Sequence, residues 1–339
     1  MFGLRNNRRR ATIALGSAAL LALAGCGGGG GGDDETTGAG STGGATNGGG
    51  GGDELVRVGF SQLGAESGWR TANTGSIQES LTPDNGIDMT FVDAQQRQEN
   101  QIRALRDFIS QDMDVIAFSP VIETGWDQVL QEIKDAGIPV VLVDRTVDTT
   151  VEDPFVTWIG SDFRAEGVTA GEWVAENHPD ANVFELQGTL GSGAQVDRQE
   201  GFREVVGDQV IGQASGNFTR AEGRTAMEAA LQAYPDLDLV FSHNDDMGLG
   251  AIEAIEAAGL VPGEDIHIVA VDAVKDGMQA LLDGKFSYLV ECNPVFGDQL
   301  AELIKQVHAG EDVPETTYVE ETAFEQADID QEFVDARPY

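Results

Sequence analysis

The chain has 339 residues, of which 41% are hydrophobic, and its formal net charge at pH 7 is −38. This length predicts two domains, and the hydrophobic fraction is ordinary for a globular protein with a sizeable core. A surface so acidic repels nucleic acid and anionic phosphate ligands at long range, which argues against nucleic acid as a partner. Only four lysines accompany sixteen arginines, and an acidic surface poor in lysine fits a protein that is soluble at high salt.

The first 25 residues have the features of an export signal. The positively charged segment "RNNRRR" is followed by the apolar run "ATIALGSAALLALAG". At about fifteen residues, this run is shorter than the roughly twenty that a membrane span needs. Its end, "LAGC", resembles the lipobox of secreted lipoproteins, which implies that Cys26 is acylated and becomes the mature N-terminus. An ordinary signal peptide with a chance cysteine is the alternative, and the Arg9-Arg10 pair leaves the general and twin-arginine export routes both open.

Residues 26–53 form the expected lipidated cysteine and a flexible tether. Fifteen of the 26 residues from Gly27 to Gly52 are glycine, so the segment cannot bury apolar area. We therefore expect an extracytoplasmic domain, anchored by lipid to the outer face of the cell membrane. Cys292 is the only other cysteine, so no disulfide framework is predicted and a small buried side chain is expected there.

From Leu55 onward the sequence alternates between two kinds of segment. Short apolar runs predict strands: "LVRVGF", "DVIAFS", "PVVLVD", "NVFELQ", "LDLVFS" and "IHIVAV". Longer patterns between them predict helices, such as "RQENQIRALRDFIS", which has Ile102, Leu105 and Ile109 on one face, and "GWDQVLQEIKDAGIP", which Gly137 and Pro139 end. This alternation predicts an α/β fold whose parallel sheets are covered by helices on both faces.

Ligands of such sheets bind at the carboxyl ends of the strands. The segments that follow the expected strands carry carboxylates, amides, guanidinium groups and aromatic rings. After the first run come Ser61, Glu66, Trp69 and Arg70, for example, and after "PVVLV" come Asp144 and Arg145. Carboxylates and amides accept hydrogen bonds from hydroxyls, arginine donates through a planar fork, and aromatic rings offer an apolar face. This combination complements a sugar, although each acid or amide could instead cap a helix and each Asp-Arg pair could be a structural ion pair.

Motifs for catalysis, nucleotide binding or metal binding are weak. The segment "GTLGSGAQ" has the glycine spacing of a phosphate loop but carries Ala194-Gln195 where Lys and Ser or Thr belong. The four histidines lie far apart in the sequence without a zinc-binding pattern. Asp245 and Asp246 could ligate a metal, but adjacent residues point apart at a helix start. We therefore expect no enzymatic activity, no cofactor and no metal.

Five segments resemble the ribose- and galactose-binding group of bacterial ABC-transporter substrate-binding proteins, and within it the galactofuranose-binding subunits. They are "VGFSQLGAESGWR", "QQRQENQIRALRDFI", "ELQGTLGSGAQVDRQEGF", "SGNFTR" and "HNDDMGLGAIEAIEAAGLVPG". The resemblance implies a type I periplasmic-binding-protein fold, with two doubly wound parallel-sheet lobes joined by three crossovers near residues 159–161, 291–293 and 319–321. The N-terminal lobe would comprise residues 54–160 and 293–319, and the C-terminal lobe residues 161–292 and 320–339.

By its motifs, the resemblance also implies which residues bind the ligand and what each does. The ten candidate residues are Glu66, Trp69, Arg70, Asp144, Arg145, Arg198, Phe218, Asn244, Asp272 and Glu291. Trp69 and Phe218 would sandwich the C–H face of a monosaccharide, Arg145 and Arg198 would donate hydrogen bonds, and the acids would accept them. Glu291 would lie at a hinge and face the cleft. Two lobes would close on the sugar, and the closed monomer would dock on a membrane permease driven by a separate ATPase.

Three other functions share parts of this pattern. Repressors with the same two-lobed core need a DNA-binding headpiece, where this chain has a signal and a tether. A sugar-active enzyme needs a paired acid and base, whereas the acids here lie beside arginines that should lower their pKa values. A ligand-binding subunit for a chemoreceptor or sensor kinase, or a binder of a different pentose or hexose, would have the same cleft.

Overall fold

The computed structural model describes residues 55–339; the expected signal peptide, Cys26 and the tether lie outside the described residues. Two six-stranded sheets organise this part of the chain, in the orders β11-β5-β4-β3-β1-β2 and β12-β10-β9-β8-β6-β7. The strands of the first sheet are β1 (Val56–Gln62), β2 (Ile87–Asp93), β3 (Val115–Phe118), β4 (Val140–Val143), β5 (Thr157–Gly160) and β11 (Thr316–Tyr318). Those of the second are β6 (Val183–Gln187), β7 (Val210–Ser215), β8 (Leu239–Ser242), β9 (His267–Asp272), β10 (Tyr288–Glu291) and β12 (Ala323–Phe324).

The strands are parallel, except that β12 pairs antiparallel with β10. Helices cover both faces of such sheets, so an inner strand can be buried at every position. Strand β3 ("VIAF") and strand β4 ("VVLV") are buried at every position. This explains why the sequence shows continuous apolar runs there instead of alternation.

Ten α-helices connect or cover these strands. Four helices belong to the lobe of the first sheet: α1 (Gly68–Ser80), α2 (Gln98–Ser110), α3 (Asp127–Ala136) and α9 (Gly297–Ala309). The others are α4 (Phe163–Asn177), α5 (Gly193–Val206), α6 (Arg220–Ala233), α7 (Asp245–Ala257), α8 (Lys275–Leu282) and α10 (Gln331–Ala336). Helix α3 ends where the sequence predicted, because Gly137 adopts a left-handed conformation (φ +72°) just before Pro139. No helix among residues 55–339 is long and apolar enough to cross a bilayer.

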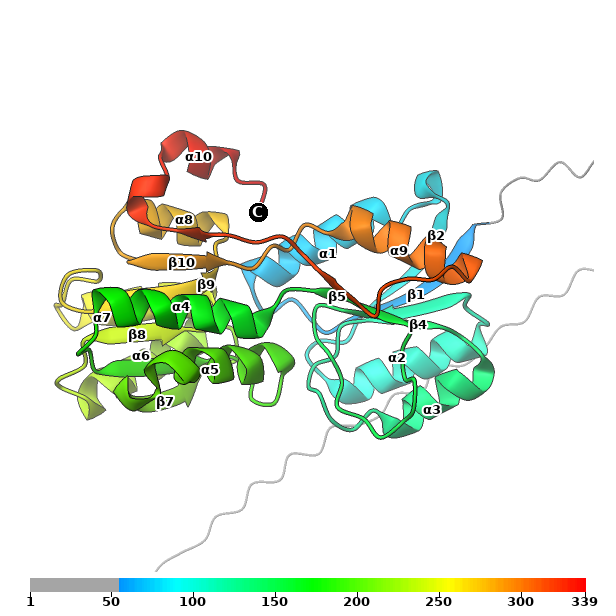
Figure 1. Ribbon diagram of the computed structural model, residues 1–339, viewed down its shortest axis with the longest axis horizontal. Helices are drawn as coiled ribbons and strands as arrows, with labels where there is room; N and C mark the ends of the chain where they lie inside the picture. Colours follow the sequence, from blue (N-terminus) through cyan, green and yellow to red (C-terminus); the bar gives the residue numbers. More distant parts are fainter. Residues whose placement is uncertain (1–54) are drawn as a thin grey trace, which may run out of the picture. The chain divides into compact units, whose positions relative to one another are not determined.

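The chain passes between the two sheets three times (Figure 1). The first passage leads from β5 to α4, which packs on α5 and β10. The second leads from β10 to α9, which packs on α1 and β3, and the third joins β11 to β12. The predicted fold class, two doubly wound lobes joined by three crossovers, is therefore confirmed.

Strand order decides where a ligand can bind. In each sheet the first strand along the chain, β1 or β6, lies between the second and third strands. The connections from this strand diverge to opposite sides, which leaves a crevice outside its carboxyl end. The segments after β1, β6 and β8 border these crevices, and they carry Glu66, Trp69, Arg70, Arg198 and Asn244.

Candidate functional site

The loop after β1 positions the first group of side chains. Ser67 caps α1, because its side chain accepts a hydrogen bond from the Arg70 backbone N–H at 3.1 Å. This cap places Trp69 and Arg70 in the first turn, where both are buried. The Trp69 indole N–H donates to the Cys292 carbonyl at 2.6 Å, which ties the first lobe to the second crossover.

Two arginines and two carboxylates form the half of the site that the first lobe contributes. Arg70 donates to Glu66 at 3.1 Å and to Asp144 at 2.5 Å. Arg145 lies farther from the same carboxylates, at 3.6 Å from Glu66 and 3.9 Å from Asp144, and donates to the Val121 carbonyl at 3.0 Å. Burial, and then the Arg70 charge, lower the pKa of Arg145 to about 10. Burial alone would also lower the pKa of Arg70, but Asp144 and Glu66 outweigh it and raise that pKa.

One arginine and two carboxylates form the half that the second lobe contributes. Arg198, on α5, donates to Glu166 at 2.6 Å and to the His243 carbonyl, and its Nη2 lies 3.7 Å from Asp272. Although burial opposes it, the carboxylate of Glu166 and the other negative groups raise the pKa of Arg198. Burial raises the pKa of Asp272 well above its ordinary value, with Arg198 acting in the opposite direction. The expectation that the neighbouring arginine lowers the pKa is therefore wrong for Asp272, because burial dominates.

Three aromatic rings face these guanidinium groups. The Arg70, Arg145 and Arg198 guanidinium carbons lie 4.6, 5.2 and 5.2 Å from the ring centroids of Trp69, Phe218 and Phe163, respectively. Such cation–π contacts keep the guanidinium groups paired in a buried site.

Backbone geometry sets the position of Phe218. Phe218 has a positive φ of 62°, and its ring lies so close to Gly188 that a Cβ there would come within 1.9 Å. Asn244 caps α7 by accepting from the Met247 N–H at 3.0 Å, and it also donates to the Phe218 carbonyl at 3.2 Å. Asn244 therefore both caps α7, as the sequence suggested, and lines the pocket.

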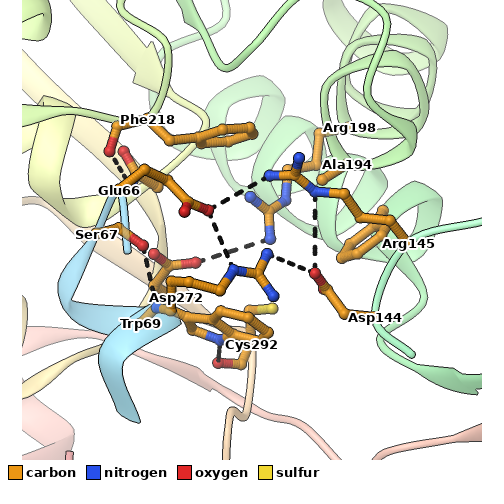
Figure 2. A pocket seen from close by; sticks show the side chains of 13 residues that line it. Glu66, Ser67, Trp69, Asp144, Arg145, Ala194, Arg198, Phe218, Asp272 and Cys292 are labelled. Carbon is orange, nitrogen blue, oxygen red and sulfur yellow. Dashed lines mark hydrogen bonds and ion pairs between the residues drawn. The ribbon is translucent and has the colours of Figure 1, made fainter. Parts of the chain in front are cut away.

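Nine of the ten candidate residues line one pocket, and Figure 2 labels seven of them and draws their contacts. The nine are Glu66, Trp69, Arg70, Asp144, Arg145, Arg198, Phe218, Asn244 and Asp272. The cavity volume is about 20 Å³, against about 300–1,000 Å³ for ordinary ligand pockets. A ligand the size of a sugar therefore requires the two halves to separate and these side chains to move.

Several buried polar atoms in the pocket have no hydrogen-bond partner among the described residues. They are Glu66 Oε2, Arg70 Nη1 and Arg145 Nε. Buried polar atoms are rarely left unpaired, because each loses its interaction with water. The pocket thus offers one acceptor and two donors to a polar ligand, and all three come from the first lobe.

Glu291 lies elsewhere, so the expectation that it faces the cleft requires a correction. Its carboxylate accepts from Arg337 at 2.6 Å, from the Tyr339 hydroxyl at 2.7 Å and from the Thr322 N–H at 3.1 Å. These partners belong to the C-terminal segment, whose position sequence patterns did not indicate. Glu291 fastens that segment to the end of β10 and does not line the pocket.

Sequence reasoning also missed residues that line or support the pocket: Ser67, Phe163, Glu166, Ala194 and Cys292. Phe163 and Glu166 lie in the first turn of α4, directly after β5. These residues lie in "SDFRAEG", which directly follows β5, so the rule that ligand groups follow strands could have found them. The chain crosses to the other lobe at this point, however, so the segment does not lie in the lobe of the strand that it follows.

Two hydrogen bonds link the lobes at the rim of the pocket. The Gly68 N–H at the start of α1 donates to Asp246 at 2.7 Å, and the Glu123 N–H donates to the Gly191 carbonyl at 3.0 Å. Burial raises the pKa of Asp246, and the hydrogen bond from the Gly68 N–H acts in the opposite direction. Both contacts join segments that belong to different sheets.

A cluster at the crossovers is the one arrangement among residues 55–339 whose ligand atoms could converge on a metal. Potential ligand atoms of Glu166, Cys292 and Glu321 lie within 4.8 Å of one another, and Ser161 contacts the Cys292 sulfur at 3.2 Å. Arg198 already neutralises Glu166. Burial, together with the Glu166 charge, raises the pKa of Glu321 to about 9, so a proton neutralises this carboxyl group at neutral pH. Arg198 and this proton therefore balance the negative charges of Glu166 and Glu321.

Comparisons with known proteins agree with this geometry. A family model described as the periplasmic binding protein domain matches residues 58–312. The galactofuranose-binding protein YtfQ of Escherichia coli K12 is 39% identical over 287 residues, which cover 80% of this chain and 90% of YtfQ.

Two solved structures are also similar. A crystal structure from Mycobacterium smegmatis in complex with β-D-fucofuranose is 53% identical, with a TM-score of 0.79, and covers 81% of this chain and 92% of that one. The periplasmic binding component of the arabinose ABC transporter from Shewanella sp. ANA-3, bound to α- and β-L-arabinofuranose, is 43% identical, with a TM-score of 0.77, and covers 80% and 92%. Each of these three proteins is named for, or holds, a five-membered sugar ring.

Proposed function

Because this chain belongs to the periplasmic binding protein domain family, we propose that it is the extracytoplasmic sugar-binding protein of an ABC importer. It captures a monosaccharide, galactofuranose or a related furanose, between its two lobes. The observation that carries this proposal is the convergence of nine sugar-complementary residues, from loops far apart in the sequence, on one pocket between the lobes. The furanose ring form is taken from the relatives, since a pyranose would need the same residue types.

The chemistry of binding follows from the two halves of the pocket. Trp69 and Phe218 offer ring faces for the sugar C–H groups, and Arg70 and Arg145 donate to its hydroxyls through atoms that have no partner among the described residues. Glu66 and Asn244 accept from hydroxyls. Asp272, at the end of β9, also accepts from hydroxyls.

Closure of the lobes is the proposed mechanism of capture. We place the moving bodies at residues 54–160 with 293–319 and at residues 161–292 with 320–339. The open cleft leaves each charged group hydrated, and the ligand stabilises the closed form, in which hydrogen bonds form away from water. The rim contact between Gly68 and Asp246 forms only when the lobes meet. Glu291 is left out of the sugar-binding set.

The remaining parts of the proposal concern delivery. The lipid anchor at Cys26 and its tether hold the monomer at the outer face of the membrane, where a permease and its ATPase take up the sugar. We propose no catalytic role, because Glu66, Asp144 and Glu166 are paired with arginines instead of forming an acid–base pair across a substrate.

Calorimetric titration of the purified protein in high salt tests this proposal. The sugars are ribose, arabinose, glucose and galactose, and crystals of the tightest complex give the ring form. We expect binding of galactose or arabinose as the five-membered ring, and failure of all four to bind would contradict the assignment. Long incubation with the bound sugar serves as the second arm, because formation of any product would contradict the non-enzymatic role.

A further inference from the structure

A second cavity adjoins the proposed sugar pocket. Its volume is about 180 Å³. Phe163 lines both cavities. Two pairs of consecutive residues also divide between them. Arg145 and Arg198 line the first cavity, and their neighbours Thr146 and Asp197 line the second. The two cavities are therefore neighbours that share the Phe163 side chain.

Aromatic side chains line one side of this second cavity. Phe155, Trp158 and Tyr318 contribute to it, together with Phe163. The Tyr318 ring packs edge-on against Trp158, with centroids 5.6 Å apart and an interplanar angle of 77°. Tyr318 is nonetheless 59% exposed on the short strand β11, so its ring adds little to the core. An exposed aromatic ring beside a sugar pocket is a surface on which another sugar ring can stack.

Carboxylates line the cavity as well. They belong to Asp162, Asp197 and Glu315, and no lysine or arginine lines the cavity with them. Burial, and then the charges of Glu200 and Asp162, raise the pKa of Asp197. The Asp197 carboxylate makes no hydrogen bond to another side chain within residues 55–339, so it is able to accept from a hydroxyl. An anionic ligand such as a uronic acid would be repelled by these charges.

We infer that the second cavity binds a second, neutral sugar residue, linked to the furanose that occupies the first pocket. The inference rests on the proposed function and names its substrate class as a disaccharide or glycoside with a furanose at its nonreducing end. Aromatic stacking and carboxylate acceptors repeat the chemistry of the first pocket. The cavity is smaller than the about 300–1,000 Å³ of a pocket for a drug-sized ligand, which limits the occupant to one ring.

Calorimetry with two probes tests this inference. The probes are D-galactose and a disaccharide of two galactose units with galactofuranose at its nonreducing end. We expect the protein to bind the disaccharide about tenfold more tightly than galactose, as a stacked ring and one hydrogen bond would give. Tyr318→Ala should remove this advantage and leave the affinity for galactose unchanged, whereas Tyr318→Phe, which keeps the ring, should preserve most of it.

A second pair of variants tests the acceptor. Asp197→Asn should reduce the advantage of the disaccharide by about threefold, and Asp208→Asn, at an exposed position outside the cavity, should leave it intact. Binding of galactose together with equal or weaker binding of the disaccharide to the unaltered protein would overturn the inference and leave the proposed function standing. Failure of both probes to bind would overturn the proposed function together with the inference.

Discussion

The two halves of the pocket use similar residues in different proportions. The half from the first lobe pairs two arginines, Arg70 and Arg145, with two carboxylates, and Arg145 is held by longer contacts than Arg70. The half from the second lobe has one arginine, Arg198, between Glu166 and Asp272. Among the described residues, the first half therefore has two unpaired donor atoms besides the acceptor Glu66 Oε2, whereas the unpaired atom of the second half, Glu166 Oε1, is an acceptor.

This difference explains how one cleft can hold its own side chains in place and still offer unpaired groups to a ligand. Arg198 is saturated by its own lobe and holds that half together, because its removal would leave two buried carboxylates uncompensated. Arg145 has an unpaired Nε and a pKa lowered to about 10, so it is the group with the most to gain from a ligand. We interpret Arg198 as mainly structural and Arg145 as mainly ligand-binding.

The largest expected effect is on stability, when each of these two arginines is replaced by methionine in a separate variant. Arg198→Met should lower the free energy of unfolding by about 3–5 kcal/mol, since it breaks a buried ion pair. Arg145→Met should cost only about 1–2 kcal/mol, because Arg70 still neutralises Glu66 and Asp144. Denaturant unfolding without sugar measures both.

An exposed arginine provides the control for that pair. Arg164 pairs with Glu204 on the surface, so Arg164→Met should change stability by about 0.5 kcal/mol or less. Equal losses for Arg198→Met and Arg145→Met would contradict the division of roles.

The excess of carboxylates extends from the second half into the crossovers, where Glu321 has a pKa raised to about 9. A group whose pKa is higher in the folded than in the unfolded state stabilises the fold below its unfolded pKa, and this stability is lost as the pH rises through the folded pKa. We therefore expect stability to fall by a few kcal/mol, at about 1.4 kcal/mol per pKa unit, between weakly acidic pH and about pH 9.

Glu321→Gln should flatten this decline, because glutamine keeps the acceptor for the Asn293 N–H without a titrating group. Thermal unfolding of both proteins at several pH values measures the difference. Parallel curves for the two proteins would show that Glu321 does not hold the proton.

Phe218 tests the ring face that the second lobe offers to the sugar. Phe218→Leu keeps most of the apolar volume against Gly188 but removes the flat face, so the affinity for the sugar should fall about tenfold. Phe333→Leu, at a partly exposed aromatic residue on α10, is the matched control and should leave affinity unchanged. An unaltered affinity in Phe218→Leu would remove the ring from the proposed clamp.

The smallest expected effect concerns the rim contact between Gly68 and Asp246. Asp246→Ala removes an acceptor that is used only when the lobes meet, so the affinity should weaken about fivefold with little change in stability. Asp276→Ala changes an exposed acid that makes only a surface ion pair, so it should have no effect. A loss of stability as large as the loss of affinity would mean that the contact persists in the open form.

The sequence predicted the fold class, and strand-end position together with the family resemblance predicted nine of the residues that now lie together. It succeeded there because parallel strands direct their following loops to one edge. It failed for Glu291, since the Arg337 and Tyr339 side chains that bind it come from a distant segment without a periodic pattern. It also failed for the pKa of Asp272, because the sequence does not show how deeply this carboxylate is buried.

The most direct test of the account is a crystal structure of the protein with its sugar. We predict a five-membered ring between Trp69 and Phe218, with Arg145 Nε donating to a hydroxyl and the Arg198–Glu166 pair unchanged. A sugar held by Arg198 after that pair has broken, or bound away from Arg145, would contradict the division of the pocket into a receptive and a structural half.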